Sequence, residues 1–138
     1  MPSGAKRRRV NEDDIVADAS AILAALKNEP FNNVDPRRLV GATISAVNFC
    51  EVLSKLHDDG LNDAQAHAAV SRMDLRVIPF DGPQARTAAQ LRSTTRHAGL
   101  SLGDRACLAL GDRLRCPVVT ADRIWANLGV GVEILVIR

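Results

Sequence analysis

Short apolar segments alternate with longer amphipathic segments along most of the chain. The apolar, β-leaning segments are residues 15–17, 42–44, 76–80, 117–120 and 132–137, and each has the length of a single strand. Helices are predicted between them, over residues 21–27, 46–57, 63–73, 82–97 and 102–114, with shorter helices at 34–40 and 123–127. Strands that alternate with helices favour a three-layer α/β fold, in which helices cover both faces of a mostly parallel central sheet.

The predicted helices begin next to residues that commonly cap helices. These residues are Ser20, Ser45, Asn62, Asp81 and Ser101. Their side-chain oxygens can accept hydrogen bonds from the free N–H groups of a first helical turn. The caps therefore set the expected boundary between each preceding segment and its helix.

One domain accounts for nearly the whole chain. Its 138 residues are the size of a single domain, and no internal repeat or linker divides them. We expect residues 1–14 to be a flexible basic tail, because they are polar and contain the run Lys6-Arg7-Arg8-Arg9. That run could attract nucleic acid, although a solvated tail is the simpler interpretation. Residues 15–138 are expected to form the folded domain.

Composition limits the kinds of partner. The net charge is only +2 and aromatic residues make up 3%, so any nucleic acid would be bound mainly through its backbone. Cys50, Cys107 and Cys116 form no C-x-x-C pair and are predicted to be buried thiols in a reducing compartment. No apolar run approaches the roughly 18 residues of a membrane span, and no signal-peptide core follows the basic start. A cytoplasmic protein without a membrane segment is expected.

Four carboxylates lie where a parallel sheet commonly binds ligands. Asp18 follows the first strand, Asp122 follows the fourth, and Asp104 is in the first turn of a long helix. Glu51 lies on the helix after the second strand, on the same face as core residues, and is predicted to point inward. Ligands of open α/β sheets bind at the carboxyl ends of the strands, so these acids are candidates for one site.

Converging carboxylates repel one another unless a cation lies among them. Hard divalent ions such as Mg²⁺ or Mn²⁺ prefer carboxylate and water oxygens, and they can activate water and offset charge on a phosphoryl group. The four acids therefore indicate metal-assisted hydrolysis of a phosphodiester. His57, His67 and His97 are scattered over predicted helices without ligand spacing and are interpreted as surface histidines.

Each acid also has a purely structural interpretation. Asp18 could end its strand in an Asx turn. Asp104 could form a capping pair with Ser101, and Asp122 could cap the short helix that follows it. Glu51 could pair with Lys55 one helical turn away. These interpretations do not explain why the acids are placed together. They also leave a carboxylate on an inward face, which is costly without a partner.

Two motifs near the end of the chain carry a family resemblance. They are Gly99-Leu-Ser-Leu-Gly-Asp104-Arg-Ala-Cys-Leu-Ala-Leu110 and Cys116-Pro-Val-Val-Thr-Ala-Asp122-Arg-Ile-Trp125, and together they resemble the VapC-type PIN domain. The stretches Ile15-Val-Ala-Asp18-Ala-Ser20-Ala and Ile44-Ser-Ala-Val-Asn48-Phe-Cys-Glu51-Val resemble the first two motifs of that family. The resemblance extends from about residue 15 to residue 138.

The resemblance implies both a site and an activity. The four acids named above would form one pocket for Mg²⁺ or Mn²⁺, with Asp18 and Asp104 as the most direct ligands. Three polar residues align with positions beside that pocket: Ser20, Asn48 and Thr120. The implied activity is that of a metal-dependent endoribonuclease, the toxin of a toxin–antitoxin pair. The implied partners are an RNA substrate, a cognate antitoxin protein and a second copy in a homodimer.

Two features depart from the family pattern. The basic tail is longer than expected for the family. The segment of residues 28–41 is short and contains Pro30 and Pro36, whereas in the family this region forms a helical arm that binds the antitoxin.

Arg105 and Arg123 are candidates for steering an anionic backbone at the rim of the pocket. Solvated positions on helices explain these two arginines as well.

Two other functions are compatible with the fold. A receiver-type signalling domain also has an aspartate cluster at its strand ends and binds Mg²⁺. It would need a phosphate-contacting lysine at the end of its last strand, whereas Lys27 and Lys55 are the only lysines beyond the tail. A catalytically inactive binding module would keep the fold without the chemistry, and the presence of all four acids argues against it.

Overall fold

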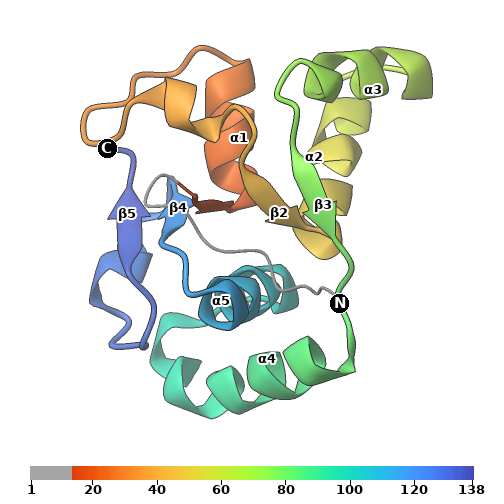
Figure 1. Cartoon of the computed structure of the whole chain (residues 1–138). Coiled ribbons are helices and arrows are strands. Elements are labelled where there is room, and N and C mark those ends of the chain that lie inside the picture. Colours follow the sequence, from red (N-terminus) through yellow and green to blue (C-terminus); the bar gives the residue numbers. More distant parts are fainter. Residues whose placement is uncertain (1–13) are drawn as a thin grey trace, which may run out of the picture.

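Five parallel strands form the central sheet of the computed structural model, which describes residues 14–138 (Figure 1). The strands are β1 (Val16–Ala17), β2 (Thr43–Ser45), β3 (Arg76–Ile78), β4 (Val118–Thr120) and β5 (Ile134–Val136). Their order across the sheet is β3-β2-β1-β4-β5, and every neighbouring pair is parallel. The predicted three-layer α/β fold is confirmed, and the described sheet is parallel throughout.

In the described residues, five α-helices and three 3-10 helices connect the strands. The α-helices are α1 (Ala19–Leu26), α2 (Ala46–Asp58), α3 (Asp63–Ser71), α4 (Gly82–Thr94) and α5 (Leu102–Leu114). The 3-10 helices are η1 (Pro36–Leu39), η2 (Arg96–Ala98) and η3 (Arg123–Asn127). Figure 1 shows α1, α2 and α3 on one side of the sheet and α4 and α5 on the other.

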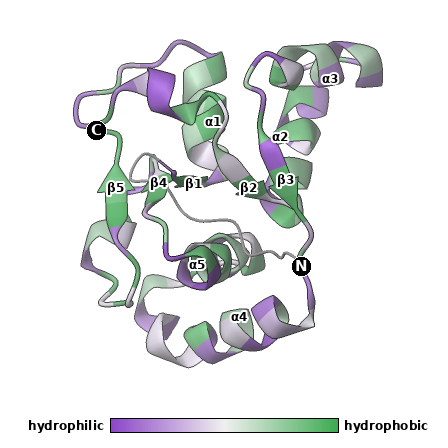
Figure 2. Cartoon of the chain, in the orientation of Figure 1, coloured by the Kyte–Doolittle hydropathy of each residue, from purple (hydrophilic) through white to green (hydrophobic). Residues whose placement is uncertain are grey.

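Successive residues of the first strand point to opposite faces of the sheet and help to build two cores. Val16, which lies beside Val118 in the sheet, packs with Leu108 of α5. Ile15 and Ala17 pack on the other face, against residues of α1 and α2. Strands covered on both faces are apolar along their whole length, as expected for a parallel sheet. In Figure 2 hydrophobic colouring dominates β5, whereas α4, on the outside, is mostly pale or hydrophilic.

The first helix begins earlier than predicted. It starts at Ala19, so Ser20 lies inside its first turn and does not cap it. The capping position belongs to Asp18, whose side chain forms no cap hydrogen bond. That side chain bonds to the hydroxyls of Ser20 and Thr120 instead, which is why the helix starts without a side-chain cap.

Other predicted boundaries also differ from the structure. The helix expected at residues 34–40 is only the four-residue 3-10 helix η1. The helix before Gly99 ends early, at Thr94, and the 3-10 helix η2 follows before Gly99 turns the chain with a φ of 64°. β3 ends at Ile78 because Pro79 has no N–H to donate to a neighbouring strand.

One of the three cysteines is not buried as predicted. Cys107 and Cys116 are buried, but Cys50 is exposed. The inward face of α2 is formed by residues at four-residue spacing, namely Asn48, Val52 and Leu56. Because Cys50 lies between these positions on the helix, its side chain faces solvent.

The predicted basic tail lies almost wholly outside the described residues, which begin at Asp14. The domain boundary at residue 15 therefore stays a prediction. Within residues 14–138, no helix combines the length and the apolar character needed to cross a membrane.

Candidate active site

The carboxyl end of the central strand β1 carries a buried aspartate. Asp18 follows β1 directly, and its backbone N–H donates to the carbonyl oxygen of Val119 in β4 at 2.9 Å. The residue is only 5% exposed. Since β1 lies between β2 and β4, the segments that follow these three strands begin at the same edge of the sheet.

Two hydroxyl groups donate to one oxygen of Asp18. Ser20 Oγ lies 2.6 Å from Asp18 Oδ2, and Thr120 Oγ1 lies 3.0 Å from the same atom. Each hydroxyl also accepts a backbone N–H, Ser20 from Ala121 at 2.9 Å and Thr120 from Asp122 at 3.1 Å. These bonds orient the carboxylate. Within the described residues, no hydrogen bond reaches its other oxygen, Oδ1.

Glu51 lies at the surface, and its predicted inward orientation is wrong. Its side chain is exposed because α2 turns Asn48 and Val52 toward the core. Glu51 Oε1 accepts a hydrogen bond from Asn48 Nδ2 at 2.9 Å, and the same Nδ2 donates to the carbonyl oxygen of Gly103 at 2.9 Å. The buried Asn48 thereby links Glu51 on α2 to the first turn of α5.

Gly103 gives the Glu51 carboxylate room against α5, and the sequence interpretation missed this residue. A Cβ at position 103 would overlap the carboxylate oxygens of Glu51. Glycine within a helix costs about 1 kcal/mol relative to alanine. A glycine in the first turn of a well-capped helix therefore indicates that another group packs closely against the helix at that position.

Asp104 and Asp122 both cap helices, as their structural interpretations predicted. Asp104 N donates to Ser101 Oγ at 3.1 Å, and Ser101 N donates to Asp104 Oδ2 at 2.9 Å, which completes a capping box on α5. Asp122 Oδ1 accepts the N–H of Ile124 at 3.0 Å at the start of η3. In the described residues, each of the two carboxylates accepts a hydrogen bond at one oxygen, and the second oxygen has none.

Three of the four acids share one electrostatic environment. Burial raises the pKa of Asp18 to about 6, the two hydroxyls oppose that rise, and the charges of Asp104 and Glu51 add to it. Burial also raises the pKa of the Cys107 thiol well above its usual value, with further contributions from the same three carboxylates. Glu51 and Asp104 are therefore close enough to Asp18 to repel its negative charge.

No ion pair formed within residues 14–138 neutralises this group. The pairs that do form join other acids to Lys27, Arg37 and Arg138, so the pair considered for Glu51 and Lys55 is not made. Carboxylates that converge without a counter-ion have the chemistry of a site for a hard divalent cation. In the described residues no three His, Cys, Asp or Glu side chains already surround one position, so the four-acid metal site stays a prediction.

The two arginines considered for the rim of the pocket have other contacts. Arg105 is buried, with 8% exposure, and its Nη1 donates to the carbonyl oxygen of Ala88 on α4 at 2.9 Å. Arg105 therefore lies neither at the rim of the pocket nor in solvent, so both interpretations of this residue are wrong. Arg123 is exposed, and its Nε donates to the carbonyl oxygen of Arg138 at 3.0 Å.

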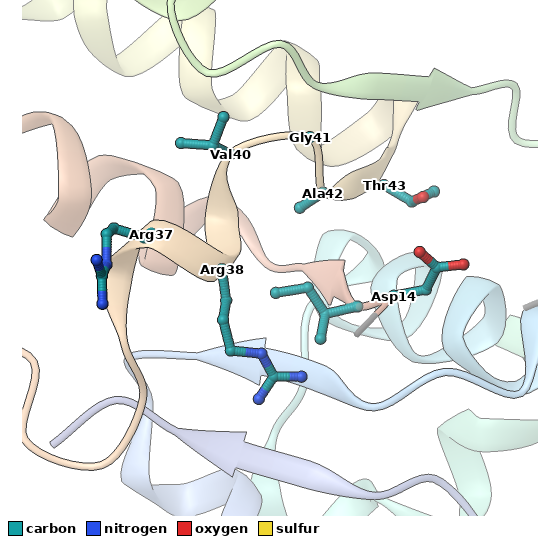
Figure 3. A pocket seen from close by; sticks show the side chains of 8 residues that line it. Asp14, Arg37, Arg38, Val40, Gly41, Ala42 and Thr43 are labelled. Carbon is teal, nitrogen blue, oxygen red and sulfur yellow. The ribbon is translucent and has the colours of Figure 1, made fainter. Parts of the chain in front are cut away.

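A separate hollow of about 430 Å³ lies at the opposite edge of the sheet. It is lined by residues of η1 and of the segments that lead into β1 and β2, namely Asp14, Ile15, Arg37, Arg38, Val40, Gly41, Ala42 and Thr43 (Figure 3). None of the four acids lines it. Ligands of parallel sheets bind at the carboxyl ends of the strands, so the volume of this hollow does not make it the active site.

Comparison with known proteins gives one family and one fold. A sequence profile of the PIN domain matches residues 15–131. No curated protein sequence matches the chain significantly. The crystal structure of FitAcB from Neisseria gonorrhoeae is similar, at 22% identity and a TM-score of 0.62 over 87% of this chain and 95% of that one.

Two further solved structures share this fold. DNA-bound VapBC from Salmonella typhimurium has 18% identity and a TM-score of 0.67, and the match covers 88% of this chain and 96% of that one. VapC20 from Mycobacterium tuberculosis, described as a toxin that cleaves the sarcin-ricin loop, has 19% identity and a TM-score of 0.63, with 87% and 99% covered. At these identities the likeness shows the fold.

Proposed function

Because the chain belongs to the PIN-domain family, we propose that it is a divalent-metal-dependent endoribonuclease, the toxin of a toxin–antitoxin pair. One observation carries the proposal. Asp18 lies at the carboxyl edge of the sheet, where burial raises its pKa and two further carboxylates add to the rise, and no described ion pair offsets these charges. An arrangement that is unfavourable for stability is typical of a functional site.

The donor set fits Mg²⁺ or Mn²⁺. Asp18, Glu51, Asp104 and Asp122 would hold the ion, since all four offer carboxylate oxygens and neither histidine nor thiolate is required. When bound, such an ion lowers the pKa of water and offsets charge that develops on phosphoryl oxygens. The choice between Mg²⁺ and Mn²⁺ is part of the proposal.

The residues around the acids orient them for this role. Ser20 and Thr120 both donate to Oδ2 of Asp18, which directs Oδ1 to a ligand. Asn48 positions Glu51 through the bond from its Nδ2 to Oε1. Catalytic groups gain most when such contacts set their geometry before the substrate arrives.

The partners in the proposal follow from the proteins with the same fold. VapC20 is described as a toxin that cleaves the sarcin-ricin loop, and VapBC-5 from Mycobacterium tuberculosis is described as a member of a family of toxin–antitoxin systems. We infer that this chain cleaves RNA, is inhibited by a cognate antitoxin protein and forms a homodimer. RNA binding would depend mainly on backbone contacts, because the chain offers few aromatic side chains for stacking.

Cleavage of a mixed RNA pool by the purified protein tests the proposal. With Mg²⁺ or Mn²⁺ we expect cut products, and with EDTA we expect none. The variant Asp104→Asn should lose at least a hundredfold in rate, because asparagine retains the cap on α5 but not the charge. Asp112→Asn is the matched control, since Asp112 is an exposed acid on the same helix. A folded Asp104→Asn variant that cleaves at the wild-type rate would overturn the proposal.

A further inference from the structure

One stretch of the described chain carries only positive charge. Residues 82–103 contain three arginines, Arg86, Arg92 and Arg96, and no aspartate or glutamate, although the whole chain has a net charge of only +2. This stretch forms α4, η2 and the entry to α5. All three arginines are exposed, and none belongs to an ion pair within the described residues. Their charge is therefore available to a partner.

Two of these arginines line a hollow next to the segment that leads into α5. The hollow has a volume of about 250 Å³, and its walls are Arg92, Thr95, Arg96, Gly99 and Leu100. The buried Thr95 closes the end of α4 by donating from Oγ1 to a backbone carbonyl at 2.6 Å. Leu100 directly precedes the serine that caps α5 and bonds to the Asp104 carboxylate. The hollow thus borders the segment that positions one of the four acids.

A buried contact sets the place of α4 relative to that acid. Arg105, next to Asp104 in the chain, donates from Nη1 to the carbonyl oxygen of Ala88 at 2.9 Å. Ala88 is 1% exposed and lies one helical turn before Arg92. The first turn of α5 and the middle of α4 are therefore joined directly, so Arg92 on α4 keeps a defined position relative to Asp104.

We propose that Arg92 and Arg96 bind the phosphate backbone of single-stranded RNA next to the acidic site. The inference rests on the proposed nuclease function. A site with several carboxylates repels a polyanion, so nearby cations that are not neutralised are needed to hold it. Guanidinium groups match phosphate oxygens in geometry and charge. Contacts of this kind do not read sequence, so they place the backbone and leave base selection to other residues.

Binding of a fluorescent RNA oligonucleotide of mixed sequence, in EDTA to stop turnover, tests this assignment. The double variant Arg92→Gln/Arg96→Gln should bind about tenfold more weakly at low salt. The slope of log affinity against log salt should fall by about 1.4, since each lost phosphate contact on a single strand removes about 0.7. The charge-preserving variant Arg92→Lys/Arg96→Lys should recover most of the binding.

The matched control is Arg72→Gln/Arg76→Gln. Both of these arginines are exposed, and Arg76 lies at the start of β3, away from the carboxyl edge of the sheet. The control should bind RNA as the wild type does, and circular dichroism should show all variants folded. Wild-type affinity and salt slope in the Arg92/Arg96 variant would overturn the assignment. If that variant instead lost only the binding of a protein partner, the RNA assignment would be overturned as well.

A cleavage assay separates this inference from the function on which it rests. If the wild type cleaves RNA with Mg²⁺ and the double variant has a raised KM with little change in kcat, both proposals are supported. If the wild type cleaves and the double variant has an unchanged KM, only the arginine assignment fails. If the wild type cleaves no RNA at all, the proposed function fails, and this inference fails with it.

Discussion

Asp18 combines deep burial with a negative environment. Its carboxylate is 5% exposed, is bonded by two hydroxyls at one oxygen, and lies near the charges of Glu51 and Asp104. Proteins retain such unfavourable charges mainly where function requires them. At the scale of single residues, we therefore expect changes to these acids to affect stability and activity in opposite directions.

The variant Asp18→Asn should stabilise the metal-free protein at neutral pH. The pKa of Asp18 is about 6 when folded, above its ordinary value of 3.8, so the folded state binds the proton more tightly than the unfolded state does. The contribution of this group is favourable below about pH 4 and is lost as pH rises through 6. At pH 7.5 the variant should be more stable by about 1–3 kcal/mol.

Urea unfolding in EDTA at pH 4.5 and pH 7.5 measures this effect. The difference in the free energy of unfolding between variant and wild type should be larger at pH 7.5 than at pH 4.5. A difference that is independent of pH would show that the Asp18 carboxylate is not destabilised by its surroundings.

Gly103→Ala should reduce activity without reducing stability. The added Cβ overlaps the Glu51 carboxylate, which is at the end of an exposed and flexible side chain and can move away. Alanine is the better helix former by about 1 kcal/mol, which offsets the lost contact. We expect a change of less than about 1 kcal/mol in the free energy of unfolding and at least a tenfold loss of RNA cleavage.

Gly82→Ala is the matched control for this glycine. Gly82 opens α4, and a Cβ there would meet no atom within 4 Å. This control should retain full activity. Full activity in Gly103→Ala as well would mean that the position of Glu51 does not matter for the chemistry.

At the scale of elements, two helices have the same kind of cap but different neighbours. Ser101 on α5 and Asn62 on α3 each form a capping box, with Asp104 and Gln65 respectively. Only the box on α5 includes an acid of the candidate site. A comparison of these two capping boxes therefore separates the effect of a cap on stability from its effect on the candidate site.

Ser101→Ala and Asn62→Ala should each lower the free energy of unfolding by about 1 kcal/mol, because each leaves a first-turn N–H without its acceptor. Only Ser101→Ala should also slow RNA cleavage, by several-fold, because it removes one of the bonds that place Asp104. Thermal unfolding and initial cleavage rates measure the two effects. Equal activity in both variants would show that the cap on α5 plays no part in the site.

Capping patterns explain which elements were predicted well. The helix over residues 102–114 has its predicted bounds because the cap at Ser101 marks its start clearly. The face of α2 that turns inward was misjudged, because both faces of this helix carry apolar residues and only packing against the neighbouring elements selects one. Glu51 and Cys50 were misplaced for that reason.

At the scale of the whole molecule, the strand order explains why acids that are distant in the sequence lie toward one edge of the sheet. β1 is central, with β2 and β4 on either side, so the segments that carry Asp18, Glu51 and Asp122 start at one edge. The alternation of strands and helices predicted a parallel sheet but not the order β3-β2-β1-β4-β5. It could not show that Asp104, which follows no strand directly, lies near Asp18, since that proximity depends on how α5 packs across the sheet.

Calorimetric titration with Mn²⁺ is the most direct test of the claim that these acids bind a hard cation. The wild type should bind one or two ions. Asp18→Asn and Asp104→Asn should each bind at least tenfold more weakly, and Asp112→Asn should bind as the wild type does. A wild type that binds no Mn²⁺, or Asp18 and Asp104 variants that bind it unchanged, would contradict the account.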